Sequence, residues 1–377
     1  MTDYKIPLMS DIECYRKNGY KVVSTFSGCG GSCLGYEMTG YTVLWANEFI
    51  KAARETYCMN HDGVILDGRD IREVKGSDIL NAIHMKPGEL DVFEGSPPCS
   101  EFSMAGKRRG GITTLEHKGW GHKKKYSDSF QQVDDLFFEY ARLLNELQPK
   151  MFQAENVKGL TLGHAKDVLG SPQIDFFDQW QKTIFHTLTA CGYNVKYKVL
   201  NAWHYGVPQA RERLIIIGVR NDIKIEYEYP KPVAQRFTLR DALEGLTVTK
   251  EDLEPTELKG KTLEIVQQLK PGQSGAEIMD GSYFSLKRLE WNEPAGTIQQ
   301  SEAKMASTNQ IHPDENRRLS IKELKRVGSF PDDFYLTGTF AQQWERIGRA
   351  VPPIMMAHIA ASIRTTLNKM KEGTNGS

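Results

Sequence analysis

Several side chains that can do chemistry follow directly after strand-like runs in the first half of the sequence. Cys99 comes at the end of Gly95-Ser-Pro-Pro98, where two prolines stiffen the turn that presents its thiol. Lys107, Arg108 and Arg109 follow shortly afterwards, and positive neighbours stabilise a thiolate. Cys99 is therefore a candidate nucleophile. A lone cysteine is more often a small core residue, so both interpretations stay open at this point.

A glycine-rich loop precedes this cysteine in the chain. It reads Phe26-Ser27-Gly28-Cys29-Gly30-Gly31 and lies between an apolar strand-like run and a helix-like segment. Glycines there let the backbone approach a ligand closely and turn tightly into the helix. Glu48 ends the next strand-like run, 18 residues after Gly30, and Asp70 follows the third such run. A tight turn alone would explain the glycines, but a carboxylate at Glu48 is placed to accept from ribose hydroxyls. The pattern therefore favours an adenosine-type cofactor.

A carboxylate and two arginines make up a third group. Glu155 follows a short apolar run, and Arg211 and Arg213 belong to the segment Gln209-Ala-Arg-Glu-Arg213. In isolation these residues would be interpreted as a structural ion pair. Together with Cys99 they combine a nucleophile, an acid and anion-binding groups.

These residues need a scaffold that brings the ends of several strands together. Strand-like runs occur at 21–26, 43–46, 64–66, 90–93 and 151–154, and apolar residues recur at helical spacing through 133–147. Alternation of this kind predicts a mostly parallel sheet with helices on both faces, in which ligands bind at the carboxyl edge. Two further runs, 193–200 and 214–219, have no helix between them and are predicted to form an antiparallel hairpin that completes the sheet.

The character of the sequence changes after Arg220. Residues 221–315 are dense in turn formers and lack the spacing of a long helix, so we expect a smaller and more irregular domain there. Helical spacing returns later, at Leu319, Leu324 and Val327 and again near the end of the chain. The predicted organisation is a large domain at 1–220, a second domain at 221–315, and a segment at 316–377 that returns to the first.

The composition excludes several classes of protein. The chain has 377 residues, of which 40% are hydrophobic and 25% charged, so disordered, collagen-like and disulfide-scaffold proteins are excluded. With 48 basic and 48 acidic side chains the net charge is zero, which argues against nucleic-acid binding by bulk charge. The six cysteines lack zinc spacing, no apolar run is long enough to cross a membrane, and the start has no apolar signal core. We therefore expect a soluble cytoplasmic protein without a metal site.

Six motifs occur in the order and spacing of the DNA cytosine-5 methyltransferase family, which the chain resembles except in the variable residues 221–280. They are Phe26–Gly31, Pro98-Cys99, Glu155-Asn-Val157, Gln209-x-Arg211-x-Arg213, Arg318-Leu-Ser-Ile-Lys-Glu323 with Phe330-Pro-Asp332, and Gly348-Arg-Ala-Val-Pro-Pro353. The resemblance implies an α/β fold of the Rossmann-like class I S-adenosylmethionine-dependent methyltransferase type. Its sheet would be mixed and mostly parallel, with a smaller inserted target-recognition domain.

The resemblance also implies a mechanism. A target cytosine is flipped out of the duplex, Cys99 attacks ring position 6, and Glu155 protonates or hydrogen-bonds ring nitrogen 3. Position 5 then takes a one-carbon group from S-adenosylmethionine, and loss of the position-5 proton expels the cysteine. A neutral pyrimidine is a poor carbon nucleophile, so covalent addition must come first. Arg211 and Arg213 are implied to hold the base carbonyl, the nearby phosphate and the glutamate.

The remaining matched residues fall into two implied sites. The cofactor-binding residues implied by the resemblance are Phe26, Ser27, Gly28, Cys29, Gly30, Gly31, Glu48, Phe49, Asp70, Ile71, Pro97, Arg349 and Ala350. The residues implied to face DNA are Ser100, Lys107, Arg108, Arg109, Gln209 and Thr297. Between Met104 and Lys125, seven Lys or Arg residues and one acid leave a local excess of six positive charges. Such a segment suits a loop that closes over DNA phosphates, the alternative being an ordinary solvated loop.

One residue departs strongly from the family pattern. Arg349 stands where the last motif normally has asparagine beside the methionine part of the cofactor. A guanidinium ~4 Å from a positive sulfonium would repel it by about 4 kcal/mol at an effective dielectric of ~20. Arg349 could instead reach a DNA phosphate or a nearby Asp or Glu. Alternatively the donor is carboxy-S-adenosylmethionine, whose carboxylate Arg349 would bind, and the product is 5-carboxymethylcytosine.

Other functions account for fewer of these residues. A nicotinamide dehydrogenase would use the glycine loop and Glu48 but leave Cys99 and Glu155 unexplained, and a non-catalytic DNA-binding module would need neither of the last two. A tRNA-directed relative shares the catalytic motifs, yet the large insert favours duplex DNA. We therefore expect a monomer that acts on double-stranded DNA in the cytoplasm of a bacterial or phage-infected cell.

Overall fold

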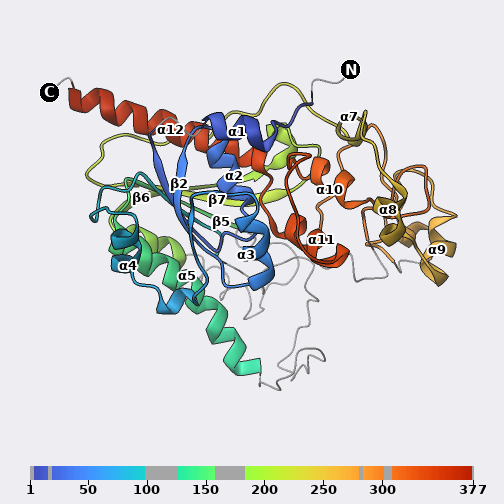
Figure 1. Ribbon diagram of the computed structural model, residues 1–377, viewed down its shortest axis with the longest axis horizontal. Helices are drawn as coiled ribbons and strands as arrows, with labels where there is room; N and C mark the ends of the chain where they lie inside the picture. The colour runs from blue at the N-terminus through green and yellow to red at the C-terminus, as the bar shows by residue number, and fades with distance from the viewer. Residues whose placement is uncertain are drawn as a thin grey trace, which may run out of the picture.

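Seven strands form one mixed sheet in the computed structural model of the protein, which describes residues 4–15, 19–97, 126–157, 183–279, 283–300 and 308–375. The strand order is β3-β2-β1-β4-β5-β7-β6 (Figure 1). The strands are β1 (Lys21–Thr25), β2 (Thr42–Asn47), β3 (Ile65–Asp67), β4 (Val92–Gly95), β5 (Met151–Val157), β6 (Tyr193–Asn201) and β7 (Glu212–Arg220).

The pairing of the strands confirms the predicted mixed, mostly parallel sheet. Strands β1 to β5 pair in parallel, whereas β7 runs antiparallel to both β5 and β6. The predicted hairpin of β6 and β7 is therefore present. Its register places Arg213 opposite Val157, at the carboxyl end of β5.

Helices cover both faces of the sheet, as Figure 1 shows. On one face, α2 (Gly31–Glu37), α3 (Lys51–Cys58) and α12 (Pro353–Asn375) share a hydrophobic core with the sheet. On the other face, α4 (Gly76–Ala82) and α5 (Tyr126–Leu147) share a second core with it. Because the central strands are buried on both faces, they read as apolar runs rather than as alternating ones. The C-terminal helix therefore belongs to the same body as the N-terminal strands.

The region after β7 is irregular, as its turn-rich sequence predicts. Its helices are short: α7 (Leu239–Leu243), α8 (Lys250–Leu253), η5 (Glu254–Thr256), α9 (Gly260–Val266) and η6 (Gly275–Glu277). A small separate core forms there from Leu258, Ile265, Val266, Leu269, Leu286 and Ile311. Figure 1 shows α7, α8 and α9 at the opposite end of the molecule from α4 and α5. The domain boundaries at 221 and 315 remain a prediction.

Two short helices lead the chain back to the large domain, and each starts with a capping box. In α10 (Ile321–Val327) the Ser320 hydroxyl accepts from the Glu323 amide, while Glu323 accepts from the Ser320 amide. Glu323 also receives the guanidinium of Arg317 at 2.8 and 2.9 Å, with both side chains buried. In α11 (Phe340–Arg349) Thr339 and Gln342 cap each other in the same way. The Ser-x-x-Glu pattern in this motif is therefore a helix start that anchors the returning segment.

Candidate active site

The carboxyl edge of the sheet gathers most of the residues that the sequence singled out. In the parallel register, Thr25 at the end of β1 pairs with Asn47 of β2 and with Gly95 of β4, and Gly95 pairs with Ala154 of β5. The segments that leave these strands therefore start side by side. They carry the glycine loop, Glu48, the Pro97 turn and Glu155, which is the expected position of a ligand site in this type of sheet.

The glycine loop is held in a conformation that requires its glycines. Gly30 has φ +90° and precedes the first turn of α2, and a Cβ on it would lie 1.9 Å from Nε2 of His61. Gly28 has φ +58°, yet a Cβ there would meet no atom within 4 Å. The loop is thus packed against protein on one side and open on the other at Gly28. Cys29 is buried, and burial raises the pKa of its thiol to about 12, so this cysteine stays protonated.

Glu48 lies against this loop at the end of β2. Its two carboxylate oxygens accept from the backbone amides of Gly28 at 2.8 Å and of Ile50 at 2.6 Å. The residue is 7% exposed, whereas the next residue, Phe49, is 64% exposed. A fixed carboxylate beside an uncovered aromatic ring can accept from sugar hydroxyls and stack on a base.

Asp70 and Ile71 continue this edge after β3. The Asp70 carboxylate accepts from the Arg72 amide and pairs with the Arg72 guanidinium at 2.9 Å. Ile71 is 3% exposed and opens the short helix η1 (Ile71–Glu73). The two residues lie where the sequence placed the base-binding end of an adenosine site.

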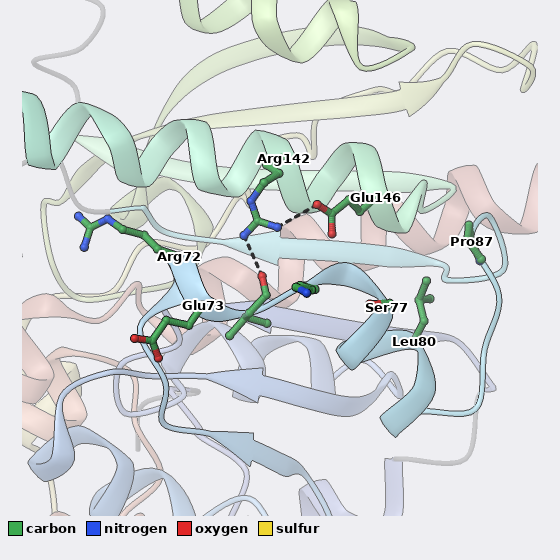
Figure 2. A pocket seen from close by; sticks show the side chains of 9 residues that line it. Arg72, Glu73, Ser77, Leu80, Pro87, Arg142 and Glu146 are labelled. Carbon is green, nitrogen blue, oxygen red and sulfur yellow. Dashed lines mark hydrogen bonds and ion pairs between the residues drawn. The ribbon is translucent and has the colours of Figure 1, made fainter.

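An open groove of about 690 Å³ lies behind η1, and Figure 2 shows the side chains that line it. Arg142 of α5 forms ion pairs there with Glu139 at 2.7 Å and Glu146 at 2.9 Å. It also donates to the carbonyl oxygens of Ile71 at 3.2 Å and Val74 at 2.8 Å. These contacts use the polar groups of the groove to fix the backbone of η1. The groove therefore supports the adenosine edge and does not form the reaction centre.

Glu155 forms an ion pair with Arg213 at the end of β5. Arg213 Nε lies 2.8 Å from Glu155 Oε1, and the two side chains are 13% and 11% exposed. Burial lowers the pKa of Arg213 and the Glu155 charge opposes this effect. The neighbouring Asn156 donates from its amide to the Pro97 carbonyl at 3.3 Å. The acid is therefore orientated by an arginine and lies next to the turn that leads to Cys99.

Arg211 and Gln209 are both buried, and each donates to backbone carbonyl groups. Arg211 is 1% exposed and donates to the backbone carbonyls of Ile298 and Gly348, so it links the irregular region to the C-terminal segment. Gln209 is 2% exposed and donates to the Val327 carbonyl. The roles of Arg211 toward the base and of Gln209 toward DNA stay predictions. Of the three, Arg213 is the residue that forms an ion pair with Glu155 in the described structure.

Arg349 ends α11 and turns toward an acid on the same helix. Its Nε and Nη2 atoms lie 3.0 and 2.9 Å from Glu345 Oε1, and its side chain is 45% exposed. The anion that the sequence called for is therefore present in the chain itself. Ala350 follows, and its Cβ would lie 3.0 Å from a Cβ on Gly31, so the glycine loop packs directly on the C-terminal segment.

Some predicted residues lie outside the described part of the chain or have a different environment from the one expected. Cys99, Ser100, Lys107, Arg108 and Arg109 are outside the described residues, so their roles stay predictions. Thr297 is described, and its hydroxyl donates to the Ala210 carbonyl at 2.9 Å.

Comparison with known proteins decides the family. A model described as C-5 cytosine-specific DNA methylase matches residues 20–365. The chain belongs to this family. It is 32% identical to the type II methyltransferase M.Sau96I of Staphylococcus aureus, over 97% of this chain and 81% of that protein. It is also 32% identical to M.FnuDI of Fusobacterium nucleatum, over 92% of this chain and 95% of that protein.

Solved structures agree on the fold of this C5 methylase. A DNA modification methyltransferase encoded within an Escherichia coli prophage has a TM-score of 0.69 at 22% identity, covering 93% of this chain and all of that one. Spodoptera frugiperda DNMT2 has a TM-score of 0.62 at 16% identity, covering 92% of this chain and all of that one. The fold is thus the predicted Rossmann-like α/β type, and the activity of the family is cytosine-C5 methylation of DNA.

The residues at the carboxyl edge of the methylase fit the cofactor that the family implies. S-adenosylmethionine needs a close backbone approach, an acceptor for its ribose hydroxyls and an apolar surface for its base. Gly28 offers the close approach because the space beside it is open, Glu48 offers the acceptor, and the exposed ring of Phe49 offers the apolar surface. Within the described residues, no group of His, Cys, Asp and Glu side chains is arranged to hold a metal ion. No helix there is long and apolar enough to cross a membrane.

Sequence reasoning missed several residues that support the site of the methylase. Arg142 and His61 act on backbone or loops that are distant in the sequence, so no local pattern marks them. Asn156 belongs to a recognisable motif, but nothing in the sequence marks its contact to the Pro97 carbonyl. Glu94 did leave a signal, because a carboxylate stands there at the end of the apolar run Leu90-Asp-Val-Phe93. In the structure Glu94 is a buried acid.

Proposed function

We propose that this methylase modifies cytosine in duplex DNA through a covalent adduct of Cys99. Cys99 Sγ adds to carbon 6 of a flipped cytosine while Glu155 binds or protonates ring nitrogen 3, which makes carbon 5 nucleophilic. When bound, S-adenosylmethionine supplies an electrophilic methyl group on its sulfonium. After carbon 5 is alkylated it loses its proton, the Cys99–C6 bond breaks, and the product is 5-methylcytosine.

The observation that carries this proposal is the Glu155–Arg213 pair beside the Pro97 turn. Arg213 fixes the direction of the carboxyl group, and Asn156 ties the strand end to the segment that leads into Cys99. An acid and a nucleophile delivered by adjacent parallel strands can act on two positions of one ring. General acid–base catalysis by a positioned group of this kind contributes about 10²- to 10⁴-fold in rate.

A fluorinated cytosine tests the covalent step directly. DNA that carries 5-fluorocytosine at target sites cannot lose a proton from carbon 5, so an enzyme with a working Cys99 should form a stable adduct with it in the presence of S-adenosylmethionine. Cys99→Ala should form none, although it should still bind DNA. If the wild-type protein methylates normal DNA yet forms no adduct, the covalent mechanism is wrong.

We further propose that the donor is S-adenosylmethionine itself. Because Glu345 already neutralises Arg349, the guanidinium does not by itself require an anionic donor. The alternative donor, carboxy-S-adenosylmethionine, is supported by the 45% exposure of the Arg349 side chain, which keeps it accessible to a second carboxylate. Mass spectrometry of nucleosides after reaction with each donor separates the two. Only 5-methylcytosine is expected, and Arg349→Asn should not change donor preference; 5-carboxymethylcytosine made by the wild type and lost in Arg349→Asn would establish the alternative.

The DNA-facing residues complete the proposal. We propose that Ser100, Lys107, Arg108 and Arg109 contact the duplex near the flipped base, and that Thr297 lies close to its backbone. The curated relatives are type II methyltransferases, so a role in a restriction–modification system follows as the biological setting. We propose that the enzyme acts as a monomer, since it modifies one base at a time.

A further inference from the structure

A buried carboxyl group in the centre of the sheet has no role in the mechanism above. Glu94 of β4 is 1% exposed and lies in register between Ser24 of β1 and Gln153 of β5. Its carboxyl group accepts from the hydroxyls of Ser24 and Ser32, the latter at 3.0 Å, and from the Cys33 thiol at 3.7 Å. In the part of the chain that the structure describes, Glu94 forms no ion pair with a basic side chain.

An ionised carboxyl group at such a buried position costs free energy unless a positive charge lies beside it. Taking an ion out of water costs several kcal/mol, and hydroxyl groups return only part of that. Accordingly, burial raises the pKa of Glu94 to about 7, and the charge of nearby Glu155 adds to the effect. At neutral pH the group therefore stands between its acid and its carboxylate form.

The polar atoms around Glu94 are not all satisfied. Both side-chain polar atoms of Gln153 and the hydroxyl of Tyr36 are buried without a hydrogen-bond partner among the described residues. In-register residues of neighbouring strands project from the same face, so Gln153 lies on the same face as Glu94. Buried unsatisfied groups are rare, and here they surround an acid. The region therefore contains hydrogen-bonding groups without partners, which can respond to a change of charge on Glu94.

Hydrogen bonds connect Glu94 to the two ends of the glycine loop. Ser24 Oγ lies 2.6 Å from Ser27 Oγ, and Ser27 belongs to the glycine loop and is 8% exposed. Ser32, the second contact, lies in the first turn of α2, directly after that loop. The carboxyl group is thus joined to the start of the loop through the Ser24 and Ser27 hydroxyls, and to its end through the Ser32 hydroxyl.

We propose that Glu94 supplies the counter-charge for a cationic donor. The carboxyl group is partly protonated when the donor site is empty and ionises fully when a sulfonium donor binds. The proton leaves to the solvent by way of the Ser24 and Ser27 hydroxyls. Glu94 is thereby a positioning residue that makes the site favour the charged donor over its neutral product. This inference rests on the proposed donor, S-adenosylmethionine.

The other titratable groups near Glu94 do not account for such a proton. Burial raises the pKa of four neutral groups on α2, α3 and α5, which stay protonated at pH 7: Cys33, Tyr36, Tyr57 and Tyr140. The acids on the surrounding elements each have a partner: Glu37 pairs with His61, Glu155 with Arg213, and Glu48 with two backbone amides. Arg346 lies 3.8 Å from Glu345, which Arg349 also contacts. Glu94 is therefore the group whose protonation is expected to follow the charge of the ligand.

Isothermal titration calorimetry of the wild-type protein tests this directly. S-adenosylmethionine is a sulfonium and S-adenosylhomocysteine is the neutral thioether, and they otherwise share the same groups. Titrations at pH 6.5 in buffers of different ionisation enthalpy count the protons released by each. We expect the sulfonium to release roughly 0.7 proton more than the thioether at pH 6.5, and the difference to vanish at pH 9. Equal release at pH 6.5 overturns the proposal.

Two matched variants identify the residue that releases the proton when the sulfonium binds. In Glu94→Gln the difference in proton release should disappear, and affinity for the sulfonium should fall about tenfold while that for the thioether changes less than twofold. Glu37→Gln is the control, because Glu37 is an equally buried carboxylate on the same face but is paired with His61. It should keep the difference. If Glu94→Gln does not fold, the wild-type titration alone decides.

Failure of the inference is distinguishable from failure of the proposed function. If neither ligand binds and DNA is not methylated, the proposed donor is wrong. If both bind with the same proton release and the protein methylates DNA, the donor is right and the role of Glu94 is wrong.

Discussion

Two buried carboxyl groups lie on neighbouring strands of the central sheet and differ in their partners. Glu155, at the carboxyl end of β5, forms a 2.8 Å ion pair with Arg213. Glu94, in β4 and one row further inside, meets only hydroxyl and thiol groups. A cation lies beside the first, whereas burial without a cation raises the pKa of the second to about 7. Glu155, at the edge of the sheet, is thus placed to act on a substrate, whereas Glu94, inside the sheet, is not.

The difference follows from where the antiparallel strand begins. β7 enters the sheet beside β5, and its second residue, Arg213, reaches Glu155. No basic residue enters the sheet beside Glu94, since its strand neighbours offer Ser24 and Gln153 at that level. Substitutions of Glu155 and Glu94 should therefore affect different properties of the protein, and by different amounts.

The largest effect is expected from Glu155→Gln. The substitution keeps the shape but removes the acid that acts on the cytosine ring, so single-turnover methylation should slow by about 10²- to 10⁴-fold. Glu94→Gln under the same saturating donor should slow it far less, because Glu94 does not touch the base. A Glu155→Gln rate within a factor of ten of the wild type would remove Glu155 from the chemistry.

Breaking the ion pair from its other side should act on stability. Arg213→Met leaves the Glu155 carboxylate buried without its cation, so we expect the free energy of unfolding to fall by about 3–5 kcal/mol. The double variant Glu155→Gln/Arg213→Met should recover part of that loss, because no unpaired charge remains. Urea denaturation of the four proteins measures this cycle. Strictly additive losses would mean that the pair contributes no coupling.

Glu94 should make the stability of the ligand-free protein depend on pH. In the unfolded chain the group ionises near pH 4.5, whereas its folded pKa is about 7. Between these values folding takes up a proton, so the stabilisation is complete below about pH 4.5 and is lost as the pH rises toward 7. The total loss should be on the order of 3 kcal/mol relative to Glu94→Gln, which does not titrate. Denaturation curves of both proteins from pH 4.5 to 8 measure it, and parallel pH profiles would contradict it.

The smallest effect is expected at an ion pair in solvent. Arg349 and Glu345 form an i,i+4 pair with side chains 45% and 23% exposed. Arg349→Asn should change the free energy of unfolding by less than about 1 kcal/mol, and raising the salt concentration should reduce the difference further. Thermal denaturation at low and high salt checks both statements. A loss as large as that of Arg213→Met would show that Arg349 has a buried partner.

Much of the fold was predictable because its signals are local. Apolar runs marked the strands, the glycine loop lay between one of them and a helix, and Glu48 and Glu155 each closed a run. The carboxyl ends of parallel strands must share an edge, so these residues were bound to meet. The Arg349–Glu345 contact was also within reach, since a helix brings residues four apart together.

Other contacts could not be predicted, because they depend on register and on packing between distant segments. Arg211 and Arg213 look equivalent in the sequence, yet within the described residues Arg213 is the one that forms an ion pair with Glu155. A shift of one residue in the pairing of β5 with β7 would turn Arg213 to the other face of the sheet. Arg211 is instead surrounded by carbonyls from positions 298 and 348.

The sequence by itself determined the order of strands and loops, the glycine loop and the acid beside it, and membership of the C5 methylase family. Only the tertiary structure decided which arginine pairs with the acid, which polar motif residues are buried, and that Glu94 has no cation beside it among the described residues. The physical reason is the range of the interactions. Backbone preferences and apolar periodicity act over a few residues, whereas the charge state of a buried group is set by partners that folding brings from 60 to 70 positions away.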